Sequence, residues 1–129
     1  MRTAALLSLL AFSACTALPG DDGPFASEAD YRAQRADALA RLSAVIGEPT
    51  AASVSACRAE PVGEQACGGP LDFAVFSAET AAPAEVAAAA GAVTALDRRA
   101  NEQFGFVSTC ALLTPPPLAL VGGRCVADR

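Results

Sequence analysis

Residues 57–77, with the sequence CRAEPVGEQACGGPLDFAVFS, carry the clearest β pattern in the chain. The run SVSACRA predicts a strand over 53–59 that carries Cys57. Residues 61–63 (PVG) then turn the chain, and the CGGP sequence brings it back. The run LDFAVFSA predicts a second strand over 71–78 with apolar side chains on both faces. We therefore expect this strand to be covered on both sides.

Two helical segments flank this stretch in the sequence. Apolar residues at helical spacing predict a helix over 28–46, with Ser27 as its N-cap. An alanine-rich helix is predicted over 83–104, because Pro83 suits a first helical turn and Gly105 suits a helix end. The small alanine side chains should let this second helix approach a sheet closely.

Three further strands are predicted after the second helix. Residues 106–113 predict one strand, and residues 118–121 and 124–127 predict a hairpin around a Gly-Gly pair. The TPPP segment, residues 114–117, is a stiff, extended connection. The predicted order is α-β-β-α-β-β-β. This order indicates an α+β domain in which two helices pack on one face of a small antiparallel sheet.

The N-terminal residues 1–14 have the composition of an export signal. One basic residue precedes an apolar run that is shorter than the roughly 20 residues needed to span a bilayer. Two small residues then precede Cys15, and this arrangement resembles the lipobox of bacterial lipoproteins, although Phe12 stands where that class usually has Leu. The resemblance implies that the signal is cut before Cys15 and that Cys15 is acylated. An ordinary secretory signal, cut after Ser13 or Ala17, is the alternative.

Three regions are expected along the chain. Residues 1–14 form the signal peptide, residues 15–26 form the lipidated cysteine with a flexible tether rich in Pro, Gly and Asp, and residues 27–129 form a single domain. Thr16 stands where enteric lipoproteins that are retained in the inner membrane have Asp. The resemblance therefore implies a lipid-anchored protein of the bacterial cell envelope, held in the outer membrane on its periplasmic side or at the surface.

The number of cysteines agrees with a lipid anchor. The chain has five, and if Cys15 carries the lipid, an even set of four remains in an oxidising compartment. We expect two disulfides among Cys57, Cys67, Cys110 and Cys125. Three pairings exist, and we favour Cys57–Cys67 and Cys110–Cys125, because each pair lies on predicted β structure that returns on itself. The gaps of nine and fourteen residues are too wide for the paired ligands of a zinc site.

The composition excludes several classes of function. The chain has no His and no Lys, so it cannot form a Ser-His-Asp triad, a Schiff base or a Walker-type phosphate loop. Its net charge of -5 argues against binding to nucleic acid, which needs a basic surface. We expect no catalytic residues, no cofactor and no metal.

The candidate binding residues lie between Cys57 and Cys67, where a disulfide would constrain the loop. They are Arg58, Glu60, Pro61 and Glu64. We expect a non-enzymatic binding or structural role, in which any partner is another envelope protein. The preordered TPPP segment is a second candidate for recognition. For both segments the favoured interpretation is an ordinary connection between elements, because loops of these lengths are common. Two alternatives remain open. One is a periplasmic inhibitor that acts on a hydrolase through this loop, and the other is a small hydrolase that uses the carboxylates of Glu60, Glu64 and Asp72.

The arrangement of the cysteines carries a second resemblance. CGGP at 67–70, STC at 108–110 and GGRC at 122–125 are similar to a pattern in a group of small exported bacterial proteins of unassigned activity. The resemblance covers residues 57–125 and includes the four cysteines of the expected disulfides. It implies the limits of the domain and its cysteine frame, and it implies nothing catalytic.

Overall fold

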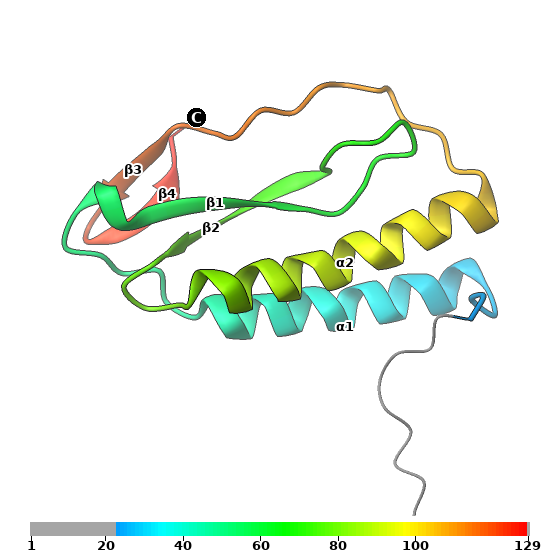
Figure 1. Cartoon of the computed structure of the whole chain (residues 1–129), viewed down its shortest axis with the longest axis horizontal. Helices are drawn as coiled ribbons and strands as arrows, with labels where there is room; N and C mark the ends of the chain where they lie inside the picture. The colour runs from blue at the N-terminus through cyan, green and yellow to red at the C-terminus, as the bar shows by residue number, and fades with distance from the viewer. Residues whose placement is uncertain (1–22, 129) are drawn as a thin grey trace, which may run out of the picture.

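Two helices and two pairs of antiparallel strands make up the part of the chain that the computed structural model describes, residues 23–128. The elements are α1 (Glu28–Ile46), a short 3-10 turn (Val54–Ala56), β1 (Cys57–Val62), β2 (Asp72–Ser77), α2 (Pro83–Phe104), β3 (Leu118–Val121) and β4 (Arg124–Ala127). The two helices lie side by side beneath β1 and β2, and the β3–β4 hairpin lies near one end of that pair (Figure 1). The predicted α+β class is confirmed.

Both helices have the bounds that the sequence predicts. The Ser27 hydroxyl accepts the N–H of Asp30 at 3.1 Å, which satisfies one of the free donors at the start of α1. Pro83 occupies the first turn of α2, where its missing N–H costs nothing. Gly105 ends α2 in the left-handed conformation at φ 64°, which glycine adopts without strain. Residues within or next to each helix therefore determine where the helix begins and ends, independently of its packing in the fold.

The core lies between the helices and the inner face of β1–β2. Its largest side chain is Phe76 of β2, which is buried against residues of both helices. Small and β-branched residues surround it, so the helices approach the strands closely. The buried members of this cluster are Ala38, Leu42, Val62, Phe76, Ala81, Val86, Ala90 and Val93. This core is thin, as the alanine-rich composition predicts.

The first strand differs from its predicted range of 53–59. It begins only at Cys57, because the residues before it form the 3-10 turn, which the hydroxyl of Ser53 caps by accepting the N–H of Ser55. The strand then continues to Val62. Pro61 lies within β1 and not in a turn, opposite Phe73 of β2. Along two antiparallel strands, only every second pair of opposite residues exchanges backbone hydrogen bonds. Pro61 and Phe73 form one of the pairs that do not, so the missing N–H of Pro61 breaks no hydrogen bond.

The last part of the chain corrects the expected sheet. The β3–β4 hairpin has its predicted bounds, but it forms a second two-stranded sheet, extended only by a bridge between Thr50 and Arg124. Residues 106–113 form no strand, so the observed order has four strands and not five. Cys110 has a φ of 55°, outside the range of extended strands, and three prolines that lack N–H donors follow it. Extended geometry is therefore interrupted inside this segment at Cys110, and the prolines prevent regular pairing just after it.

We call residues 106–117 the strap. It runs from the end of α2 to the start of β3 along the side of β1–β2 that faces away from the helices (Figure 1). Its two most exposed large apolar side chains are Val107 and Leu112, at 94% and 89% exposure. Because these side chains are in solvent, burial in the domain core is not what orders the strap.

The preferred disulfide pairing is wrong. The bonds are Cys57–Cys125 and Cys67–Cys110, each with a Cα–Cα separation of 5.5 Å. Cys57 opens β1 and Cys67 lies beyond its other end. A six-residue strand is about 20 Å long, which exceeds the reach of a disulfide. The disulfides therefore join distant elements: one ties β4 to β1, and the other ties the strap to the turn after β1.

The region expected to be the tether, residues 15–26, is described only from residue 23, so Cys15 lies outside the described residues. Phe25 packs against the domain: its N–H donates to the side-chain oxygen of Gln103 at 2.8 Å, and its ring lies 5.3 Å from that of Tyr31. Phe104 and Phe106 continue this aromatic cluster. Within residues 23–128, no helix is long and apolar enough to cross a bilayer.

Candidate functional site

Among the described residues, Asp97 of α2 is the one buried residue with a charged side chain, and its exposure is 1%. Its carboxylate accepts the Tyr31 hydroxyl at 2.8 Å and the Nε and Nη2 of Arg35 at 2.7 and 3.2 Å. It also accepts the backbone N–H of Glu64 at 3.2 Å. Both oxygens are therefore engaged, and a single carboxylate joins α1, α2 and the turn that follows β1.

Gly63 lets this turn approach Asp97. Its φ is 75°, and a Cβ built at this position would lie 2.5 Å from Oδ2 of Asp97 and 3.1 Å from the side chain of Leu71. Any side chain would displace the carboxylate from its donors. The ion pair between Asp97 and Arg35 therefore depends on a glycine at position 63.

We expect Gly63→Ala to lower the free energy of unfolding by at least about 1 kcal/mol more than Gly68→Ala does. Gly68 is the matched control, because its φ is 87° and its Cβ would meet no atom within 4 Å. Both variants therefore carry the cost of a left-handed alanine, and only Gly63→Ala also disturbs Asp97. Urea unfolding followed by circular dichroism measures the difference. Equal losses for the two variants would show that the approach of Gly63 to Asp97 is unimportant.

Burial and the contact with Asp97 shift the titration of the Tyr31 hydroxyl. Burial, the hydrogen bond to Asp97 and the charge of that carboxylate together raise the pKa of its hydroxyl to about 12. The hydrogen bond that Arg35 donates to Asp97 also raises the pKa of Arg35. Both shifts favour the protonated forms of Tyr31 and Arg35, which are the forms that donate hydrogen bonds to the Asp97 carboxylate.

Tyr31 is the single tyrosine of a chain without tryptophan, so its absorbance at high pH reports one group. We expect a phenolate midpoint near pH 12 in the folded protein and near 10 in urea. Since the folded pKa is raised, the stability that Tyr31 contributes is fully present below pH 10 and is lost as the pH rises through 12. Asp97→Asn should lower the folded midpoint. A midpoint that is the same with and without urea would contradict the described hydrogen bond.

The four candidate binding residues do not form a disulfide-closed loop. Arg58 donates from Nη1 to the carbonyl oxygens of Ser55 and Cys57, at 2.6 and 2.8 Å. Glu60 and Pro61 lie within β1, and Pro61 is exposed. The inhibitor hypothesis therefore loses its geometric premise, because the segment is a strand fastened at each end to a different element.

Glu64, the fourth candidate, is held by α2. Its carboxylate accepts Nε and Nη2 of Arg98 at 3.0 and 2.7 Å, and its carbonyl accepts the side-chain amide of Asn101 at 2.9 Å. These bonds hold the turn after β1 against the helix. Of the three carboxylates proposed for a hydrolase, Glu60 and Asp72 share one face of β1–β2 as diagonal neighbours, whereas Glu64 is engaged with Arg98.

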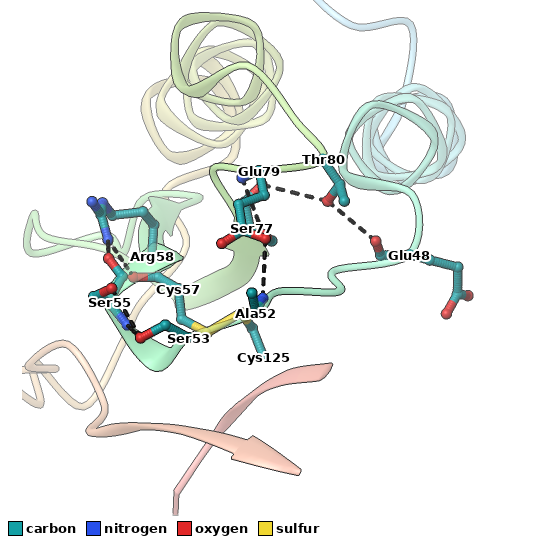
Figure 2. The surroundings of a disulfide bond; sticks show 10 residues. All are labelled: Glu48, Ala52, Ser53, Ser55, Cys57, Arg58, Ser77, Glu79, Thr80 and Cys125. Atoms are coloured by element: carbon teal, nitrogen blue, oxygen red, sulfur yellow. Dashed lines mark hydrogen bonds between the residues drawn. A yellow bond between two sulfur atoms is a disulfide. The ribbon is translucent and has the colours of Figure 1, made fainter. Parts of the chain in front are cut away.

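A second set of contacts surrounds the Cys57–Cys125 disulfide at the opposite end of β1 (Figure 2). Both cysteines are buried. Nearby, the carboxylate of Glu79 accepts the N–H of Ala52 at 3.0 Å, and the Ser77 hydroxyl accepts the N–H of Glu79 at 3.1 Å. These bonds tie the segment after α1 to the end of β2, so this region also serves to join elements.

An open hollow of about 190 Å³ lies between α1 and the inner side of β2. It is lined mainly by apolar side chains, with Arg35 and Asp72 contributing charge. Arg35 already donates two hydrogen bonds to Asp97. Residues 23–128 contain no group of three or more acidic, cysteine or histidine side chains placed to hold a metal ion.

Sequence reasoning missed Asp97, although a signal was present. The buried residues of α2 are Val86, Ala90, Val93, Asp97 and Ala100, and they recur at helical spacing. An acid on that stripe predicts a buried partner, and Tyr31 and Arg35 lie on the facing stripe of α1. Comparison of the chain with protein-family models, with curated proteins and with solved structures gives no match.

Proposed function

We propose that this protein is a lipid-anchored component of the bacterial cell envelope with a non-enzymatic binding or structural role. Anchoring rests on the lipobox resemblance at Cys15. The two disulfides support an oxidising compartment, because such bonds persist outside the reducing cytosol. The domain is therefore a folded unit displayed from a membrane by the residues between Cys15 and Phe25.

The observation that supports a binding role is the contrast between the interior and the strap. The buried polar residues of the described chain are Gln65, Ser77 and Asp97, and each bonds to groups of the protein itself. The strap, in contrast, exposes Val107 and Leu112 to solvent. The buried polar side chains thus stabilise the fold. The exposed apolar side chains of the strap, which is tied to the domain, favour recognition of a partner.

Acylation of Cys15 tests the anchor. Expressed in a bacterial host, the wild-type chain should incorporate radiolabelled palmitate and run at the mass of the processed protein. Cys15→Ser should incorporate no label, and Ser8→Ala, a conservative change within the signal, should behave as wild type. Equal labelling of Cys15→Ser and wild type would overturn the anchor. Labelling is preferred to membrane fractionation as the readout, because an uncleaved signal can also hold a protein at the membrane.

A further inference from the structure

The strap belongs to a stretch without charge. No charged residue occurs between Glu102 and Arg124, although 18% of the chain is charged. Four of the six large hydrophobic side chains that are exposed in the described chain lie in this stretch: Val107, Leu112, Leu113 and Val121. A partner that covers this surface must therefore offer apolar or aromatic contacts and not a cluster of charges.

The centre of the strap has a conformation that its sequence dictates. Proline fixes φ near about −65°, and a residue that precedes proline is restricted to extended values of ψ. Three consecutive prolines, 115–117, follow Thr114, and every described peptide bond is trans. Together these restrictions select a left-handed polyproline II helix over 114–116, a conformation without hydrogen bonds inside the helix.

Both ends of this segment are fixed to the domain. At one end Cys110 is bonded to Cys67, and the side-chain amide of the buried Gln65 donates to the carbonyl of Ala111 at 2.9 Å. At the other end the N–H of Asp128 donates to the carbonyl of Pro117 at 2.8 Å. An extended peptide held at two points loses little further conformational entropy when it binds.

We propose that residues 112–117 (LLTPPP) are a built-in peptide ligand, which docks into a groove lined by aromatic side chains on another envelope protein. Such grooves recognise polyproline II helices by packing on the proline rings and by donating hydrogen bonds to the free carbonyls. This inference rests on the proposed binding role and names the partner class for it. Leu112, which is exposed at the start of the segment, would fill an adjoining pocket.

Two other occupants fit less well. A bilayer would leave the carbonyls of a polyproline II helix without donors, and the strap offers no basic side chain to anionic headgroups. A second copy fits less well, because the aromatic cluster of the described chain, Phe25, Tyr31, Phe104 and Phe106, packs its rings on one another. A distinct protein is therefore the occupant that the strap fits.

Site-specific photo-cross-linking of the full chain in living cells tests the proposal. A benzophenone amino acid is placed at position 112, and as a control at position 36, an exposed alanine of α1. We expect position 112 to give a discrete protein adduct that position 36 does not give. Replacing all three prolines, Pro115→Ala, Pro116→Ala and Pro117→Ala, should reduce the adduct by about tenfold or more, whereas Pro83→Ala on α2 should leave it unchanged.

The contradicting outcomes separate this proposal from the binding role itself. An adduct at position 112 that survives the triple alanine change, or an adduct at position 36 alone, would overturn polyproline recognition while the binding role stands. An adduct of twice the monomer mass, or of lipid alone, would replace the proposed partner by a second copy or by a membrane, and overturn the proposal. No adduct from either position would overturn both. An unchanged circular dichroism spectrum and the intact Cys67–Cys110 bond show that the triple variant remains folded.

Discussion

Asp97→Ala is expected to lower the free energy of unfolding by about 3 kcal/mol or more. The change leaves the Arg35 guanidinium and the Tyr31 hydroxyl without their acceptor in a partly buried site, and it also frees the N–H of Glu64. Removing one partner of such a pair costs more than the pair contributes, because the remaining charge stays desolvated. The effect is large because three elements lose a common contact.

Urea unfolding of the oxidised protein measures this effect. The matched control is Asp37→Ala on the exposed side of α1, which should change stability by less than about 0.5 kcal/mol. Asp97→Asn, which keeps the shape but not the charge, should fall between the two. If Asp97→Ala and Asp37→Ala unfold at the same urea concentration, the carboxylate is not what holds α1, α2 and the turn together.

The second large effect is expected from the disulfides. Cys57→Ala with Cys125→Ala removes a bond across 68 residues, and the chain-entropy model gives a loss of about 4 kcal/mol. Cys67→Ala with Cys110→Ala removes a bond across 43 residues, so the unfolded chain gains nearly as much freedom. In this second variant, however, the exposed strap also gains freedom in the folded protein. The net loss should therefore be clearly smaller.

Thermal unfolding of the two double variants compares these losses. We expect the Cys57/Cys125 variant to unfold at the lower temperature and to lose the attachment of the β3–β4 hairpin. The Cys67/Cys110 variant should keep cooperative unfolding, while its strap becomes sensitive to proteases. A lower unfolding temperature for the Cys67/Cys110 variant would mean that the strap contributes to the core more than its exposure indicates.

The elements that are set by short-range signals could be predicted from the sequence. The bounds of α1 and α2 follow from Ser27, Pro83 and Gly105, together with the spacing of apolar residues. The β3–β4 hairpin follows from its glycine pair. In each case the residues that fix the backbone lie inside or next to the element, so no knowledge of the rest of the fold is needed.

The features that depend on distant parts of the chain could not be predicted in the same way. Residues 106–113 have the composition of a strand, but Cys110, which is bonded to the distant Cys67, departs from extended geometry. The disulfide pairing depends on where β1 ends relative to the hairpin, which sequence separation does not reveal. The sequence alone therefore predicts that the four candidate binding residues lie in a closed loop, which the fold does not form.

The connectivity of the four cysteines is the feature on which both the packing of the domain and the presentation of the strap depend. Cleavage after arginine separates the four cysteines into the peptides 42–58, 59–98, 100–124 and 125–129. Mass spectrometry of a non-reduced tryptic digest of the exported protein should therefore find 42–58 linked to 125–129 and 59–98 linked to 100–124. Linkage of 42–58 to 59–98 and of 100–124 to 125–129 would contradict the fold and leave the strap without its attachment.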